Sequence, residues 1–158
     1  MLVATLLSVS ACHPAEQGRS TSALLTRSSN ALTIQIPSCK KGAVGRFDVF
    51  ANRGRSYSMR RGKGVSETAR LVTLEITDAT LASRDFGPEV KLLGTDGAAI
   101  EHVSEITDIY LNTDVGYVEF DPNKVSYASD GRAILKGQDS GPASTTDTAD
   151  ALLTGACK

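Results

Sequence analysis

Apolar and polar residues alternate along several short stretches of this chain, which is typical of half-buried β-strands. In residues 31–36, ALTIQI, an aliphatic side chain falls on every second position. Residues 46–51, RFDVFA, alternate in the same way, and residues 71–76, LVTLEI, are rich in apolar and β-branched side chains. We therefore predict strands over these three stretches.

Three longer stretches each predict two strands joined by a tight turn. The first is 89–103, EVKLLGTDGAAIEHV, with Thr-Asp-Gly between its apolar runs. The second is 108–120, DIYLNTDVGYVEF, around Asn-Thr-Asp, and the third is 124–137, KVSYASDGRAILKG, around Asp-Gly. Branched aliphatic residues recur at every third position from Ile100 to Ile109, so a short helix is an alternative there.

Regular turns between about seven or eight strands predict a mainly β fold, a single compact antiparallel β-sandwich or barrel of jelly-roll-like type. Near the end of the chain, Thr146 or Asp147 is placed to cap a short helix through TADALL, which Gly155 would end.

The first residues are uncharged and apolar or small. Residues 2–11, LVATLLSVSA, are shorter than the roughly 20 residues of a spanning helix and suit the apolar region of a signal peptide. The run ends in Val9-Ser10-Ala11-Cys12, which resembles the lipobox of bacterial lipoproteins, although no Lys or Arg precedes it. The resemblance implies that Cys12 is acylated and begins the mature chain. His13, in place of the aspartate that retains such proteins at the inner membrane, implies outer-membrane delivery in a Gram-negative host.

The chain divides accordingly into three parts. We expect a signal peptide over 1–11, a lipid anchor and flexible tether over 12–30, and a β domain over 31–158. The tether is inferred from HPAEQGRSTSALLTRSSN, which is rich in Ser and Thr. The alternative to a lipoprotein is an apolar N-terminus with an ordinary cysteine.

Cysteine content bears on the compartment. With Cys12 acylated, Cys39 and Cys157 remain, and export to an oxidising compartment predicts a disulfide between them. Two unpaired thiols are the alternative.

A second resemblance runs over about residues 46–136. The stretches RFDVFANRGRSYSM, PEVKLLGTDGAAI and DIYLNTDVGYVEF resemble small secreted jelly-roll modules, including bacterial pre-peptidase C-terminal domains and periplasmic lysozyme inhibitors. The resemblance implies a secreted β module, but the signature loops of the inhibitors are absent, so no inhibitory residue is carried over.

The sequence contains two partial matches to catalytic motifs. Residues 137–142, GQDSGP, resemble the nucleophile loop of trypsin-like proteases with one glycine missing, and Ser38 to Lys41 match the Ser-x-x-Lys pattern. We expect no metal or other cofactor: the Cys and His residues lack metal-site spacing, and four acids near one hairpin indicate a solvated face more readily than a calcium site. These acids are Asp108, Asp114, Glu119 and Asp121.

Charge is unevenly distributed along the chain. Residues 40–63 contain eight basic residues and one acid, whereas residues 66–130 contain thirteen acids and four basic residues. The two halves could pair with each other, which is one interpretation. The other is an exposed basic loop that binds an acidic protein surface or an anionic envelope component. Its residues are Arg53, Arg55, Tyr57, Arg60, Arg61 and Lys63.

These features predict a lipid-anchored, non-enzymatic binding module of the bacterial envelope: an assembly factor, an inhibitor or an immunity protein. The net charge of −1 argues against nucleic acid as a partner. The alternative function is a small envelope hydrolase that uses Ser140 or His102.

Overall fold

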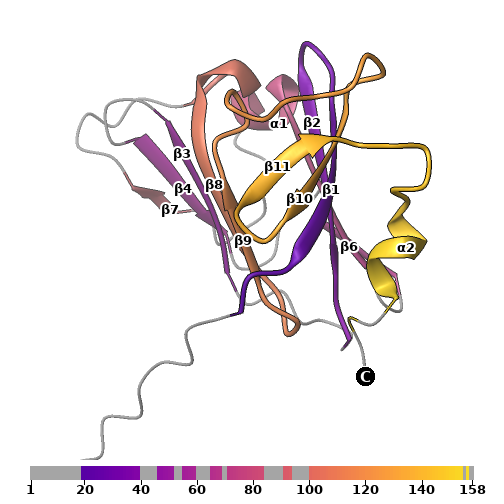
Figure 1. Cartoon of the computed structure of the whole chain (residues 1–158). Coiled ribbons are helices and arrows are strands. Elements are labelled where there is room, and N and C mark those ends of the chain that lie inside the picture. The colour runs from indigo at the N-terminus through magenta and orange to yellow at the C-terminus, as the bar shows by residue number, and fades with distance from the viewer. Residues whose placement is uncertain are drawn as a thin grey trace, which may run out of the picture.

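Two antiparallel sheets make up the fold (Figure 1). The computed structural model describes residues 19–39, 46–51, 55–59, 65–68, 71–83, 91–93, 100–154 and 156. The six-stranded sheet has the order β11-β10-β1-β2-β6-β5. Its strands are β1 (Ser22–Arg27), β2 (Ala31–Pro37), β5 (Val65–Thr68), β6 (Leu71–Thr77), β10 (Arg132–Lys136) and β11 (Asp139–Pro142).

The five-stranded sheet has the order β7-β4-β3-β8-β9. Its strands are β3 (Arg46–Ala51), β4 (Arg55–Met59), β7 (Lys91–Leu93), β8 (Ile106–Asn112) and β9 (Tyr117–Phe120). Three short helices accompany the strands in the described residues: α1 (Asp78–Ser83), the 3₁₀ helix η2 (Val103–Glu105) and α2 (Ala149–Leu153).

One aliphatic core joins the two sheets. Alternate residues are buried in β2, β6, β9 and β10, as the two-residue period of a strand requires when one face is covered. Side chains from both sheets belong to a single cluster of buried residues. Its fully buried members include Leu25, Leu32, Ile34, Ile36, Leu74, Ile76, Ile106 and Ile109.

The mainly β prediction is confirmed, and so are the strands predicted over 31–36, 46–51 and 71–76. The hairpin predicted over 108–120 is formed by β8 and β9. The C-terminal helix is also present, but its cap is Thr148, whose side chain accepts a hydrogen bond from the amide of Ala151.

Two predicted hairpins are wrong in part. In 89–103 the first strand is β7, but residues 100–102 are not a strand and η2 follows them. The helical alternative from Ile100 to Ile109 is correct only for the three residues of η2, since β8 begins at Ile106. In 124–137 only β10 is a strand, and its partner strands are β1 and β11; the residues before the turn do not form a strand with it, although the amide of Ala128 donates to the carbonyl of Arg132 at 2.8 Å. Those residues continue a loop that opens with Asp121, whose side chain accepts from the amide of Asn123 and so competes with strand pairing.

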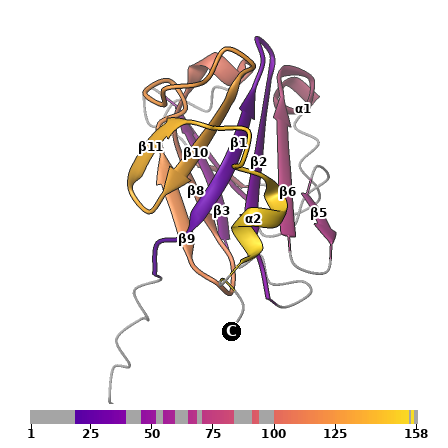
Figure 2. The same ribbon diagram turned by 45° about the vertical axis from the view of Figure 1, so that its right-hand side comes forward.

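The expected tether boundary at residue 30 is also wrong. Strand β1 lies in the middle of the six-stranded sheet, between β10 and β2 (Figure 2). Ala23 and Leu25 are fully buried in the core. The amide of Tyr117 donates to the carbonyl of Arg19 at 3.0 Å, and the amide of Thr21 donates to the carbonyl of Tyr117 at 2.9 Å. The fold therefore includes the chain from Arg19 onward.

The sheets do not close into a barrel in the part of the chain that the structure describes. A short parallel bridge between Ser20 and Tyr117 links the entry to β1 with the other sheet. In the described part of the chain, five pairs of consecutive strands form hairpins within a sheet. The jelly-roll-like type stays a prediction.

Candidate functional site

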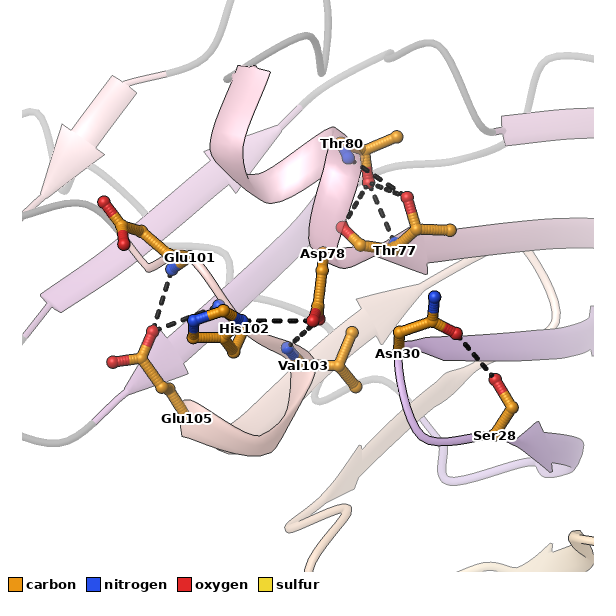
Figure 3. Close-up of polar contacts among 9 residues, drawn as sticks. All are labelled: Ser28, Asn30, Thr77, Asp78, Thr80, Glu101, His102, Val103 and Glu105. Carbon is orange, nitrogen blue, oxygen red and sulfur yellow. Dashed lines mark hydrogen bonds and ion pairs between the residues drawn. The ribbon is translucent and has the colours of Figure 1, made fainter.

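A single carboxylate, Asp78, joins α1 to the η2 segment (Figure 3). Its Oδ1 accepts from the amide of Val103 at 2.7 Å, and its Oδ2 lies 3.1 Å from Nδ1 of His102. The amide of Asp78 in turn donates to the carbonyl of Asn30 at 3.0 Å. Three segments that are distant in the sequence therefore meet at one residue.

Local sequence explains why Asp78 is held in place. The hydroxyl of Thr77 accepts from the amide of Thr80 at 3.0 Å, and the hydroxyl of Thr80 accepts from the amide of Thr77 at 2.9 Å. This reciprocal pairing satisfies amides at the start of a helix, as a capping box does. It fixes the turn from β6 into α1 and, with it, the position of Asp78.

Glu105 positions the other side of the cluster. Its Oε2 accepts from the amides of Glu101 and His102, at 2.8 and 3.1 Å. The amide of Glu105 donates back to the carbonyl of His102 at 3.0 Å. The backbone that carries His102 is therefore held by Glu105 while its ring is held by Asp78.

These contacts shift the titration of both groups. The hydrogen bond from the Val103 amide, followed by that from His102, lowers the pKa of Asp78. The hydrogen bond to Asp78 raises the pKa of His102, and the charges of Asp78, Glu105 and Glu101 act in the same direction. The pair favours ionised Asp78 and protonated His102.

An aspartate that orients a histidine is also the acid–base part of a hydrolase triad, which needs a nucleophile within reach of the imidazole. Ser140 lies in the edge strand β11, and within the described residues no hydrogen bond joins it to His102. The structure therefore provides an Asp78–His102 pair but does not bring Ser140 to it. The sequence analysis does not single out Asp78, because it predicts no helix after the strand over 71–76 and so gives no reason to place a carboxylate at a helix start there.

Asp114 connects two parts of the fold through hydrogen bonds. Its carboxylate accepts from the hydroxyl of Ser38 at 2.9 Å and from the amide of Cys39 at 3.0 Å. These bonds tie the end of β2 to the turn between β8 and β9. Ser38, part of the Ser-x-x-Lys match, is only 3% exposed, and Lys41 lies outside the described residues.

The remaining acids of that hairpin crowd one another. Partial burial, followed by the charge of Glu119, raises the pKa of Asp108, and Asp121 adds to the effect. Within the residues that the structure describes, no group of three His, Cys, Asp or Glu side chains could hold a metal ion.

The predicted basic loop is described only in part. Arg55 and Tyr57 lie in β4, so these two positions belong to a strand and not to a protruding loop. Tyr57 is aligned with Val49 of β3, which is aligned with the fully buried Ile109 of β8. The other four positions, Arg53, Arg60, Arg61 and Lys63, lie outside the described residues.

The anchor and disulfide residues are likewise described in part. Cys12 and Cys157 lie outside the described residues. Sγ of Cys39 lies 3.5 Å from the carbonyl oxygen of Ala156, the residue before Cys157 in the sequence. The Cys39–Cys157 disulfide stays a prediction.

Comparison of the chain with family models, curated proteins and solved structures found no match. Among the described residues, none of the helices has the length and apolar character needed to cross a membrane.

Proposed function

We propose that this chain is a lipid-anchored protein of the bacterial envelope whose β fold acts as a non-enzymatic binding module. One observation carries the proposal: the lipobox-like run Val9-Ser10-Ala11-Cys12 stands directly before a mainly β fold. Acylation of Cys12 would hold the chain in a leaflet, since two or more acyl chains give stable anchoring. The outer membrane is the proposed location, on the basis of His13.

The start of the fold determines how far such a module reaches from the membrane. Cys12 and Arg19 are seven residues apart in the sequence. Fully extended, this segment covers at most about 25 Å. The proposed anchor therefore keeps the β fold close to the lipid surface, much closer than a tether that lasts to residue 30 would.

The proposed partner is anionic, either an acidic protein surface or an anionic envelope component, and it contacts the basic stretch from Arg53 to Lys63. Arg side chains favour bidentate contacts with carboxylates and phosphates, and clustered like charges accelerate association with an opposite charge. The role is that of an assembly factor, an inhibitor or an immunity protein. A Cys39–Cys157 disulfide, also proposed, would fasten the chain after α2 to the end of β2.

Binding is tested with a variant in which Arg60, Arg61 and Lys63 are changed to Glu, which reverses three charges. These three positions lie outside strand β4. Affinity and its salt dependence are measured against the partner recovered by pull-down, with Lys124→Glu as the control for charge alone. We expect weaker binding and a smaller salt slope in the triple variant only. Unchanged affinity and slope would show that the basic stretch is a solvated surface.

The rival function is a small envelope hydrolase, favoured by the Asp78–His102 pair. It predicts hydrolytic activity that disappears in His102→Gln, and Ser140→Ala tests whether Ser140, which the structure does not bring to His102, has any part in that activity. Loss of hydrolysis in the first variant alone would point to a nucleophile other than Ser140.

A further inference from the structure

A cavity of about 230 Å³ lies between α2 and the six-stranded sheet. Figure 2 shows α2 lying across this sheet, and Figure 1 shows that it does so on the side away from the other sheet. The cavity is lined by residues of β1, β10 and α2 and by residues just before and just after α2. They are Ser22, Ile134, Lys136, Asp147, Thr148, Ala151, Leu152 and Thr154.

One wall of the cavity is apolar. Ile134 and Leu152 line it, and Leu24 lies directly opposite Ile134 in the pairing of β1 with β10. Leu24 and Leu152 are 5% and 9% exposed, although neither belongs to the main core between the sheets. These side chains therefore form a second, smaller apolar surface beneath α2.

Two opposite charges line the same cavity. Lys136 lies opposite Ser22 in the strand pairing, and its side chain is exposed. The carboxylate of Asp147 is held by the amide and the hydroxyl of Ser144, at 2.7 and 2.9 Å. These bonds, with smaller effects from Lys136 and Arg132, lower the pKa of Asp147 and keep it ionised.

The two charges act on each other without contact. In the described part of the chain, the ion pairs are His102–Asp78, Lys124–Asp121 and Arg132–Asp130, and none joins Lys136 to Asp147. A cation and an anion that border one cavity but do not neutralise each other can each bind an opposite charge on a ligand. Hydroxyl groups of Ser22, Thr148 and Thr154 add donors and acceptors to the lining.

We propose that this cavity binds a free aliphatic α-amino acid, with its carboxylate toward Lys136, its ammonium toward Asp147 and its side chain against Ile134 and Leu152. The volume is below the roughly 300–1,000 Å³ of sites for drug-sized ligands, which limits the ligand to a small molecule. The lining is more polar than apolar, so the two charges and the hydroxyl groups would supply most of the contacts and the apolar wall would receive a small aliphatic side chain. The proposal does not depend on the anchor or on the basic loop.

The test is an NMR titration of the full-length protein in detergent micelles with L-leucine. Two control ligands each lack one charge: 4-methylpentanoate has no ammonium group and 3-methylbutylamine has no carboxylate. We expect saturable shifts of the Ser22, Thr148 and Ala151 amide signals with leucine, and binding about tenfold or more weaker for each control, since each loses one charge-assisted contact.

Two variants of cavity-lining residues distinguish leucine binding in this cavity from binding elsewhere on the protein. Ala151→Leu fills the cavity from an exposed helix position, and Lys136→Met removes the cation; each should weaken leucine binding about tenfold or more. Lys124→Met, at a lysine that pairs with Asp121 and does not line the cavity, should bind like the parent protein. Absence of saturable shifts, equal binding of the single-charge ligands, or undiminished binding in Ala151→Leu would overturn the proposal.

Discussion

The amide of Tyr117 donates a hydrogen bond of 3.0 Å to the carbonyl of Arg19, which places the chain before β1 alongside β9. The amide of Thr21 returns a bond of 2.9 Å to the carbonyl of Tyr117. The chain thus pairs with the five-stranded sheet and then enters the six-stranded sheet as β1. The N-terminal strand is an integral part of the fold.

This pairing predicts the result of two truncations. Deletion of residues 13–30 should abolish cooperative unfolding, whereas deletion of residues 13–18, which keeps Arg19 and its hydrogen bond from Tyr117, should leave unfolding cooperative. The longer deletion removes a central strand with the fully buried Ala23 and Leu25. Circular dichroism melts of the two variants decide the point. A folded protein after the longer deletion would contradict the central place of β1.

The strands that can be predicted from the sequence are those in which apolar and polar residues alternate. Residues 31–36 and 71–76 alternate clearly because one face of each strand packs on the core and the other does not. In β1, SALLTR, the three consecutive residues Ala23, Leu24 and Leu25 are all buried, since α2 covers the outer face there. A short apolar run without alternation inside a Ser/Thr-rich stretch gives no clear strand signal.

The polar cluster was hard to predict for a different reason. His102 was identified as a candidate, but its partner Asp78 is 24 positions away, and their proximity depends on how α1 and η2 are placed. Asp114 was grouped with nearby acids because they are close in sequence, yet its partners are Ser38 and Cys39 on another strand end. Residue types suggested the chemistry, while the pairing required the fold.

The Asp78–His102 pair predicts a pH-dependent contribution to stability. The lowered pKa of Asp78 means that its contribution is present above the ordinary value of 3.8 and is lost as the pH falls through its folded pKa. The raised pKa of His102 means that its contribution is present below the ordinary value of 6.5 and is lost as the pH rises through its folded pKa. Both contributions are fully present together between the two ordinary values, from pH 3.8 to pH 6.5.

Comparison of the parent protein with His102→Gln in urea unfolding tests this. The difference in free energy of unfolding should be larger at about pH 5 than at about pH 8.5, because the contribution of protonated His102 declines as the pH rises above the ordinary pKa of 6.5 and through the raised pKa of the folded state. In an Asp78→Asn background the same histidine change should have little effect at either pH. A difference that does not vary with pH would show that the pair is not coupled.

The backbone conformation at Gly131 predicts that a side chain is not tolerated at this position. Its φ is +78°, in the left-handed region, and an added Cβ would overlap the carbonyl oxygen of Arg27. We expect Gly131→Ala to lower the free energy of unfolding by about 1–2 kcal/mol from the backbone conformation alone, and by more because of the overlap. Gly141→Ala is the matched control, since a Cβ there meets no atom within 4 Å. Equal stability of the two variants would contradict the turn geometry.

The proposed Cys39–Cys157 disulfide predicts a linked peptide pair in a non-reducing digest analysed by mass spectrometry. The chain-entropy model gives a stabilisation of about 4–5 kcal/mol for so long a loop, so reduction should lower the unfolding midpoint strongly. Cys39→Ser should unfold at the same midpoint with and without reductant. Recovery of both cysteines as free thiols from oxidised envelope preparations would disprove the link.

Acylation of Cys12 is the central claim, and metabolic labelling with a palmitate analogue tests it most directly. We predict that the parent protein and Cys39→Ser incorporate the label and sediment with membranes, whereas Cys12→Ser incorporates none and becomes soluble on cell disruption. The same labelling in Cys12→Ser as in the parent protein would contradict the claim that this chain is anchored through Cys12.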